Sequence, residues 1–259
     1  LKASLIICAA ALISGSAHGA EILKLSTGIL NDATAWNGGV LPTTADIGVY
    51  DSTTISGAAG ASFSGTNFYS GGYKVTHIAG PLTIDGTTTY IYAGAVIDMS
   101  AAAADVIFSG TLRTNGPSAG ANYTMTVGAG RTLTLKDLTY SRNAYTNPIN
   151  GGGTILLNGI ADGGGAQRVA YDVTGTGTTI GGTGTWVPSN TNGGYGVRMG
   201  AGTSIAPGSG GIGTTTFNGY HSGQAILTMA GGSGFKFELG SGGTLATPGT
   251  SDMISLLTM

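Results

Sequence analysis

The chain has 259 residues with a formal net charge of -2; 49 residues are glycine, and charged residues make up only 8%. Ten Lys and Arg residues do not supply the basic footprint of a nucleic-acid-binding protein, and frequent glycine disfavours a helical bundle because each glycine costs about 0.5–1 kcal/mol relative to alanine. Since 41% of the residues are hydrophobic, the composition predicts an all-β protein with many turns.

The segment 1–19 has the order of a secretory signal peptide. Lys2 precedes an apolar run over residues 3–13, and small residues follow up to a cleavage site after Gly19. As a helix this run would be about 16 Å long, about half the thickness of a bilayer core, so no transmembrane span is predicted. Cys8 lies in the segment, and the mature chain is therefore expected to have no disulfide and no thiol chemistry.

Short apolar or alternating runs recur from about residue 50 onward, separated by Gly, Asn and Asp. They predict strands, and the most regular is 235–239, where Phe235, Phe237 and Leu239 would share one face. Residues 101–104 could form at most one helical turn. The other predicted strands cover residues 82–85, 90–92, 96–99, 132–136, 154–157 and 225–229.

A loose motif of glycine, an apolar–Thr–apolar run and a turn residue recurs about every 14–25 residues along the chain. It occurs around Leu82, Leu112, Leu133, Ile155 and Leu245. This recurrence favours a parallel β-helix over an antiparallel sandwich or barrel, because stacked coils place small corner residues on one another. We expect about 20–22 residues per coil, some eleven coils and a rod on the order of 50 Å. Neighbouring segments that ran in opposite directions through hairpins would contradict this fold.

Three regions are predicted along the chain: a signal peptide over 1–19, an N-terminal cap with the first strands over 20–50, and solenoid repeats over 51–259. Trp36 is the residue expected to close the first coil. Residues 253–259 form an uncharged, β-prone run, which would be a template for pairing with other chains if it were left bare. We therefore expect the natural protein to continue beyond Met259 and to cover this edge.

Residues 34–51 resemble the opening segment of bacterial autotransporter-associated β-strand repeat proteins, in which a Trp, a Gly, a Pro and an Asp precede a short apolar strand. The segments 152–159, 181–186, 201–208 and 213–219 are similar to the repeats of that family. The resemblance covers most of the mature chain. It implies a right-handed parallel β-helix that is exported and displayed at the surface of a Gram-negative-type bacterium. Family members end in an outer-membrane barrel or a Pro-Glu-Pro sorting signal, so it also implies attachment through a further C-terminal segment.

Few residues suggest chemistry. His77 and His221 are the only histidines after the predicted signal peptide, and no nucleophile–His–acid arrangement can be assigned. Residues 208–213 match a dinucleotide-binding pattern by letters, but the strand-like run 214–217 follows where a helix would be required. No catalytic, cofactor or metal residue is therefore predicted.

Carboxylates carry the main alternative, because clustered acids serve acid/base chemistry in polysaccharide-degrading β-helices. The sequence spacing of Asp85 and Asp105 equals one expected coil, so the two could stack on one face, joined by Arg113 and Arg131. Asp85 and Asp98 are too close in sequence for equivalent places on successive coils. The plainer interpretation is that these acids are turn formers. The candidates are Asp85, Asp98, Asp105, Asp137, Asp162 and Asp172.

Four tyrosines lie close together in the sequence: Tyr69, Tyr73, Tyr90 and Tyr92. Such rings can stack on sugars, although an aromatic ladder that only stabilises the solenoid is the favoured interpretation.

The sequence thus predicts a secreted or cell-surface structural or adhesive rod without catalytic activity. Extracellular polysaccharide, matrix or neighbouring cells are its expected partners. A parallel β-helix polysaccharide lyase or glycosidase is the main alternative, and a fibre-forming matrix subunit is a third hypothesis.

Overall fold

A computed structural model describes residues 19–26, 29–51, 62–65, 68–76, 80–85, 88–115, 123–140, 146–162, 169–188, 196–208, 210–219, 225–238 and 251–258. The predicted signal peptide lies outside the described residues except for Gly19, and so do Cys8, His77, His221, Leu239 and Leu245. All strand pairings between the described strands are parallel, and the antiparallel contacts are three isolated bridges. The parallel β-helix is therefore confirmed, and the hairpins that would have contradicted it do not connect these strands.

The strands stack as three parallel sheets, because β4, β6, β7 and β9 bend and contribute to two sheets each. Sheet I contains β1 (Glu21–Leu23), β2 (Ile47–Asp51), the second part of β4 (Phe68–Thr76), the second part of β6 (Thr88–Met99), β8 (Thr124–Val127), β10 (Thr146–Asn150), β13 (Ala170–Val173), β16 (Val197–Met199) and β19 (Leu227–Met229).

Sheets II and III complete each coil. Sheet II contains β3 (Ser62–Ser64), β5 (Leu82–Asp85), the first part of β7 (Val106–Asn115), the first part of β9 (Thr132–Tyr140), β11 (Thr154–Leu157), β14 (Thr179–Gly182), β17 (Ser204–Pro207) and β20 (Gly234–Phe235). Sheet III contains the first parts of β4 and β6, the second parts of β7 and β9, β12 (Ile160–Asp162), β15 (Thr185–Val187), β18 (Thr214–Gly219) and β21 (Met253–Thr258).

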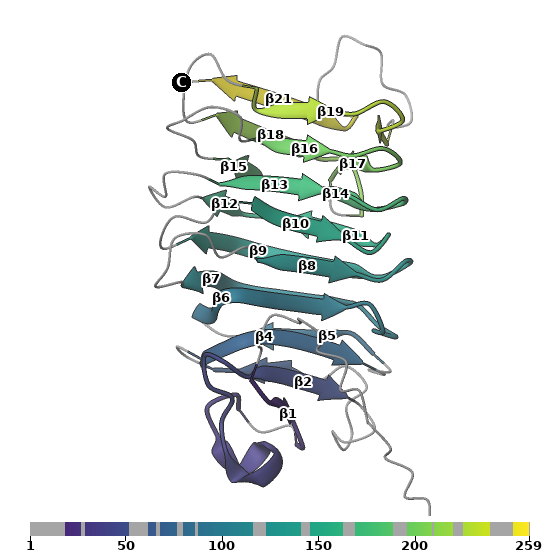
Figure 1. Ribbon diagram of the computed structural model, residues 1–259. Helices are drawn as coiled ribbons and strands as arrows, with labels where there is room; N and C mark the ends of the chain where they lie inside the picture. Colours follow the sequence, from purple (N-terminus) through teal and green to yellow (C-terminus); the bar gives the residue numbers. More distant parts are fainter. Residues whose placement is uncertain are drawn as a thin grey trace, which may run out of the picture.

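The coils climb from β1 at the bottom of Figure 1 to β21 at the top and wind in the right-handed sense, as parallel crossovers nearly always do. The predicted coil length of 20–22 residues holds for some pairs of coils and is too short for the others. Paired residues on successive coils are 21 positions apart at Phe68 and Thr89 but 39 apart at Thr214 and Met253. Three sheets and their corners need more backbone than the sequence motif indicates, and corner connections of different length add to it.

Sheet I has nine described strands, so the stack is about 38 Å tall at about 4.8 Å per coil, shorter than the rod expected from eleven coils.

The core consists of straight columns of inward side chains. In sheet II, six aliphatic residues occupy the same register position on successive coils, and all of them are fully buried. Each contributes about 1.5–3 kcal/mol of hydrophobic stabilisation relative to an exposed side chain. They are Leu82, Val106, Leu133, Ile155, Ile180 and Ile205. A matching column in sheet III comprises Leu112, Leu138, Ala161, Trp186 and Phe217.

The predicted strands 82–85 and 154–157 have the same bounds as β5 and β11. The strand predicted over 235–239, from the most regular alternation in the sequence, is not formed as expected. Strand β20 includes only Gly234–Phe235, and both Phe235 and Phe237 are 47% exposed. Among the described strands, β20 pairs with β17 alone, so only one neighbour supports it. Residues 101–104 form no helix; Ala102 N donates to Met99 O in a turn.

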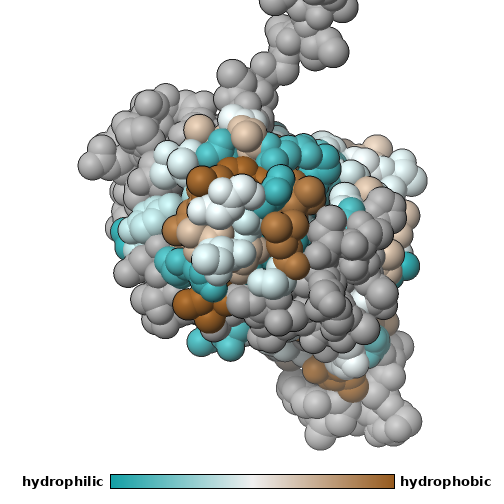
Figure 2. Space-filling view, turned by 90° about the horizontal axis from the view of Figure 1, so that it is seen from below, coloured by the Kyte–Doolittle hydropathy of each residue, from teal (hydrophilic) through white to brown (hydrophobic). Residues whose placement is uncertain are grey.

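Two short 3-10 helices, η1 (Ala33–Ala35) and η2 (Asn37–Gly39), lie at the lower end of the solenoid and flank Trp36. The Trp36 ring stacks on Phe68 with centroids 5.6 Å apart, and its Nε1 donates to Leu30 O at 2.9 Å. It is buried beneath the first coils, in the place expected for a closing residue. Figure 2 looks at this end and shows apolar surface interrupted by hydrophilic residues. The exposed large apolar side chains between residues 20 and 50 are Leu25, Ile29 and Val40.

Candidate functional site

Outward carboxylates tie one coil to the next. In each case an Asp on one coil accepts a hydrogen bond from a backbone amide, a hydroxyl or an arginine on the following coil. Such charge-assisted bonds are stronger than neutral ones. The pairs are Asp51 with Thr76 Oγ1 (2.8 Å), Asp85 with Ser109 Oγ (2.8 Å), Asp105 with Thr132 N (2.8 Å), Asp137 with Ile160 N (2.9 Å) and Asp172 with Arg198 Nη2 (2.7 Å). These carboxylates therefore stabilise the stack.

Asp85 and Asp105, which the sequence spacing would have allowed to stack, do not align. Asp85 ends β5 and is level with Ser109, whereas Asp105 lies just before β7 and is level with Thr132. The two positions differ by four residues along the strand direction, or about 13 Å, in addition to one coil. Arg131 donates to Ala103 O at 2.7 Å, and Arg113 lies on a different sheet. The coil between β5 and β7 has more residues than the sequence spacing of the two acids. Asp85 therefore lies at the end of β5, and Asp105 lies before the start of β7.

Asp98 lies on sheet I, where Lys74 is its register partner, so the prediction that it does not share a position with Asp85 is confirmed. Its Oδ1 accepts hydrogen bonds from Ser100 N and Ser100 Oγ, which closes the turn after β6.

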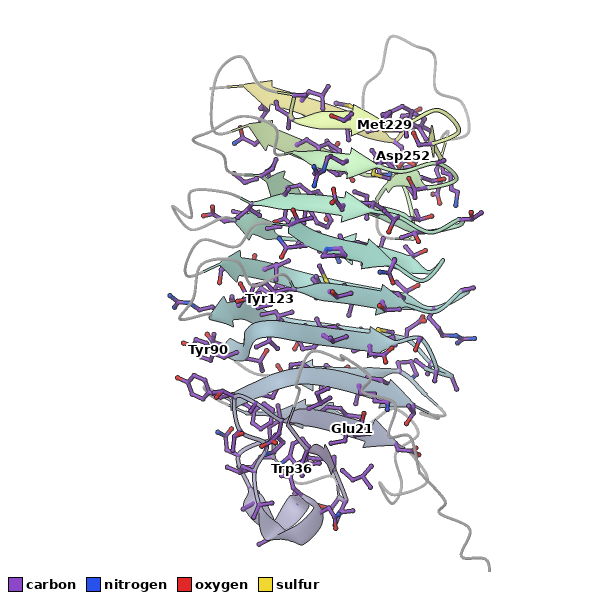
Figure 3. All side chains as sticks on the ribbon, viewed as in Figure 1. Glu21, Trp36, Tyr90, Tyr123, Met229 and Asp252 are labelled. Atoms are coloured by element: carbon purple, nitrogen blue, oxygen red, sulfur yellow. The ribbon has the colours of Figure 1, made fainter. Side chains whose placement is uncertain are left out.

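An aromatic and cationic column runs up the outer face of sheet III. Tyr69, Tyr90 and Arg113 are direct register partners on three successive coils. The tyrosine rings stack with centroids 4.5 Å apart and planes 14° apart, and the Arg113 Cζ lies 5.9 Å from the Tyr90 ring centroid. Tyr69 is 40% exposed, and Tyr90 projects from the side of the solenoid in Figure 3. We call these three residues the outer column.

The tyrosine cluster expected from the sequence is divided. Tyr73 points into the core between Gly48 and Ile97, and burial raises the pKa of its hydroxyl. Tyr69 and Tyr73 are four residues apart, which on a regular strand would place them on the same face. A register shift between Ser70 and Gly72 reverses the alternation, so one ring faces solvent and the other the core. The side chain of Tyr92 lies outside the described residues.

Above the outer column, Thr139 and Asp162 occupy the same register position on the next two coils. The neighbouring outward position carries Thr111 and then Asp137. Asp137 and Asp162 are one coil and two residues apart, which corresponds to about 8 Å between their backbone positions. The register positions named here therefore combine two aromatic rings, one guanidinium, two carboxylates and hydroxyl groups.

Lys24 is a buried cation that sequence reasoning missed. Its side chain is fully buried at the foot of a sheet I core column, beneath Tyr50, and its Nζ lies 5.3 Å from the Trp36 ring centroid. Desolvation lowers the pKa of Lys24 to about 8, against a smaller opposing effect of Asp32. Its position just after an apolar strand residue and before a Gly-containing loop offers no pattern that marks burial.

Lys24 should make the stability of the N-terminal coils depend on pH. Because its pKa is near 8 in the folded chain and near 10.5 when unfolded, the unfolded state binds more protons between these values. The free energy of unfolding should therefore rise as the pH is raised from 7.5 to 9.5. Over the full range between the two pKa values the rise should reach at most about 3 kcal/mol. Urea unfolding at a series of pH values measures this rise.

Two variants test that assignment. Lys24→Met should flatten the pH profile and raise stability at pH 7, since a buried charge is replaced by an apolar side chain of similar length. Lys74→Met removes a more exposed lysine, paired with Glu21 at 2.8 Å, and should leave the rise in place. An unchanged profile in Lys24→Met would assign the pH dependence to another group.

Within the described ranges, no group of three or more His, Cys, Asp or Glu side chains could hold a metal ion. The same part of the chain contains no helix with the length and apolarity needed to cross a membrane. Residues 210–213 lead directly into β18, so the expectation that a strand follows the glycine-rich letters is confirmed.

No known protein family, curated protein or solved structure matches this chain.

Proposed function

We propose that the chain is a non-catalytic β-solenoid that is exported and displayed at the cell surface, where it acts as a structural or adhesive rod. One observation carries the structural, non-catalytic part of the proposal: outward carboxylates along the stack are used to tie successive coils together. An active site needs polar side chains that converge on a substrate, whereas these side chains hold the scaffold in register.

Export and display are supported by the signal-peptide pattern of residues 1–19 and by the resemblance to autotransporter-associated repeats. The expected partners are extracellular polysaccharide, matrix or neighbouring cells, and the proposal requires no cofactor. A stack held by backbone hydrogen bonds and a continuous core suits a chain that has no cysteine after residue 8.

A polysaccharide lyase or glycosidase is the second candidate function, because Arg113, Asp137 and Asp162 face outward on successive coils of sheet III. The backbone positions of the two acids are about 8 Å apart, so parallel side chains would place their carboxyl groups within the roughly 6.5–9.5 Å of an inverting glycosidase. Against it, Asp137 Oδ1 already accepts a hydrogen bond from Ile160 N.

Purified protein incubated with neutral and acidic polysaccharides separates the two functions. We expect no new reducing ends and no unsaturated uronide ends above the level of a heat-treated sample. Turnover that disappears in Asp137→Asn or Asp162→Asn, but persists in Asp98→Asn, would select the enzyme. For display, antibody labelling of intact cells should detect the protein and external protease should remove the signal. Protein found only inside the cells would contradict the proposed function.

A further inference from the structure

We infer that Asp46 is the binding site for the new amino terminus that cleavage of the predicted signal peptide creates at Ala20. This inference rests on the export in the proposed function, and it assigns a role to one carboxylate of the N-terminal cap. It follows from the position of Asp46 beside the predicted cleavage point, from the orientation of its carboxylate and from the chemistry of the cleaved bond.

The backbone nitrogen of Ala20 is directed at Asp46 before cleavage. Its N–H donates to Asp46 Oδ1 at 2.8 Å. The Ala20 carbonyl oxygen accepts a hydrogen bond from Ile47 N at 3.0 Å, and β1 continues from Glu21 as the parallel partner of β2. Backbone pairing on one side and the carboxylate on the other therefore fix where the Ala20 nitrogen lies.

The Asp46 carboxylate is oriented by Thr43. Its Oδ2 accepts hydrogen bonds from Thr43 N at 2.9 Å and from Thr43 Oγ1 at 2.6 Å, while Oδ1 is directed at Ala20. The hydrogen bonds from Thr43 also lower the pKa of the Asp46 carboxyl. Asp46 is therefore an oriented anion at neutral pH, which is what the capture of an ammonium group requires.

Cleavage changes the group that Ala20 presents to this anion. Water adds across the Gly19–Ala20 peptide bond, the carboxyl group stays with Gly19, and the released amine of Ala20 takes up a proton. One neutral N–H donor is thereby replaced by an ammonium group with three N–H donors, which forms a stronger, charge-assisted hydrogen bond with Oδ1. Gly19 packs so closely that an added Cβ would collide with Oδ1, and its departure leaves room for the ammonium group.

The neighbouring charges leave Asp46 as the partner of the new amine. The carboxylate of Glu21, the next residue, is paired with Lys74 Nζ at 2.8 and 3.0 Å. Cleavage gives up the hydrogen bond from Gly19 N to Ala45 O, and the ion pair replaces it as the contact that holds the start of β1. Because Ala20 is exposed, water screens this pair and its effect is modest.

Two measurements on exported protein test the inference. Amino-terminal sequencing should give Ala20 as the first residue. Acylation of the α-amino group at pH 7, followed by mass spectrometry of the first tryptic peptide, then reports protonation, because only the neutral amine reacts. Acylation should be about threefold faster in Asp46→Asn, since a neutral amide no longer stabilises the ammonium group. At pH 10, where the amine is neutral in both proteins, the rates should be equal, which separates charge from accessibility.

Asp32→Asn is the matched control, since Asp32 lies in the same cap and accepts hydrogen bonds from the amide and hydroxyl of Thr34 at 3.0 and 2.7 Å. It should leave the acylation rate unchanged. The inference is overturned if Asp46→Asn reacts at the original rate at pH 7, if it is equally faster at pH 10, or if Asp32→Asn reacts as fast.

The first residue of the protein separates this inference from the proposed function. Exported protein that begins at a residue other than Ala20 contradicts the inference alone. Protein that stays inside the cells with residues 1–19 attached contradicts the proposed function as well.

Discussion

Replacing Gly182 by alanine is expected to lower the free energy of unfolding by about 4 kcal/mol. Gly182 ends β14 with φ of 100°, a conformation that L-residues rarely adopt. An added Cβ would lie 2.0 Å from the Leu157 carbonyl oxygen on the coil below. Urea unfolding followed by far-ultraviolet circular dichroism measures the loss.

The backbone at Gly182 cannot move aside easily. Its N–H and C=O exchange two hydrogen bonds of 2.9 Å with Gly208, and its carbonyl also accepts one from Thr215 Oγ1 at 2.6 Å. Relief of the clash would therefore break contacts with a neighbouring coil. Because coils stack on fixed corners, strain at one corner is transmitted to those above and below.

Two glycines provide graded controls for this result. Gly130 has φ of 73°, and an added Cβ would meet nothing within 4 Å, so Gly130→Ala should cost only the strained backbone, about 1–2 kcal/mol. Gly231 has neither a positive φ nor a close neighbour, and Gly231→Ala should be neutral or slightly stabilising. Equal unfolding midpoints for Gly182→Ala and Gly231→Ala would refute the corner-stacking explanation.

Replacing Trp36 by alanine should destabilise the lower end of the solenoid by about 3–5 kcal/mol. The change removes the ring that stacks on Phe68 and meets Tyr50 edge-on at 5.8 Å, and it takes away the donor to Leu30 O. It also removes the aromatic ring beside the buried Lys24 ammonium. Hydrogen exchange should accelerate in β1, β2 and β4, because each coil of a solenoid is stabilised by its neighbours.

The second tryptophan offers a matched comparison. Trp186 is as deeply buried as Trp36 but lies in mid-stack between Ala161 and Phe217. Trp186→Ala should therefore accelerate exchange in β12, β15 and β18, with less effect on β1 and β2. Trp36→Phe should retain most of the stability, losing mainly one hydrogen bond worth about 1 kcal/mol. Identical exchange patterns in the two alanine variants would mean that the rod unfolds as one unit and that Trp36 is not a local cap.

Local sequence patterns were sufficient for the class of fold. Thr132–Leu133–Thr134–Leu135 alternates as a half-buried strand should, and Leu133 and Leu135 both face the core. The same reasoning failed for Phe235 and Phe237, because alternation describes only which side chains could share a face. Whether that face becomes buried depends on strands contributed by other coils.

The candidate site was less accessible to sequence reasoning. Tyr69 and Tyr90 are 21 residues apart, which matches the predicted coil length, whereas Arg113 follows Tyr90 after 23 residues and no sequence pattern marked it as the next member of the column. Asp85 and Asp105 do not align because their sequence spacing is shorter than the coil between β5 and β7. Tyr73 was separated from Tyr69 by a register shift at Gly71 and Gly72, a pair of glycines that can mark an irregularity in a strand but does not give the new register.

That this chain winds into an all-β solenoid follows from its residues alone, because frequent glycine, low charge and short apolar runs favour corners and strands over helices. The length of each coil, and with it which side chains meet, emerges only in the folded molecule. Register between coils depends on corner insertions and on backbone hydrogen bonds between positions that are distant in the sequence. These are cooperative, non-local interactions, and a local pattern of residues does not encode them.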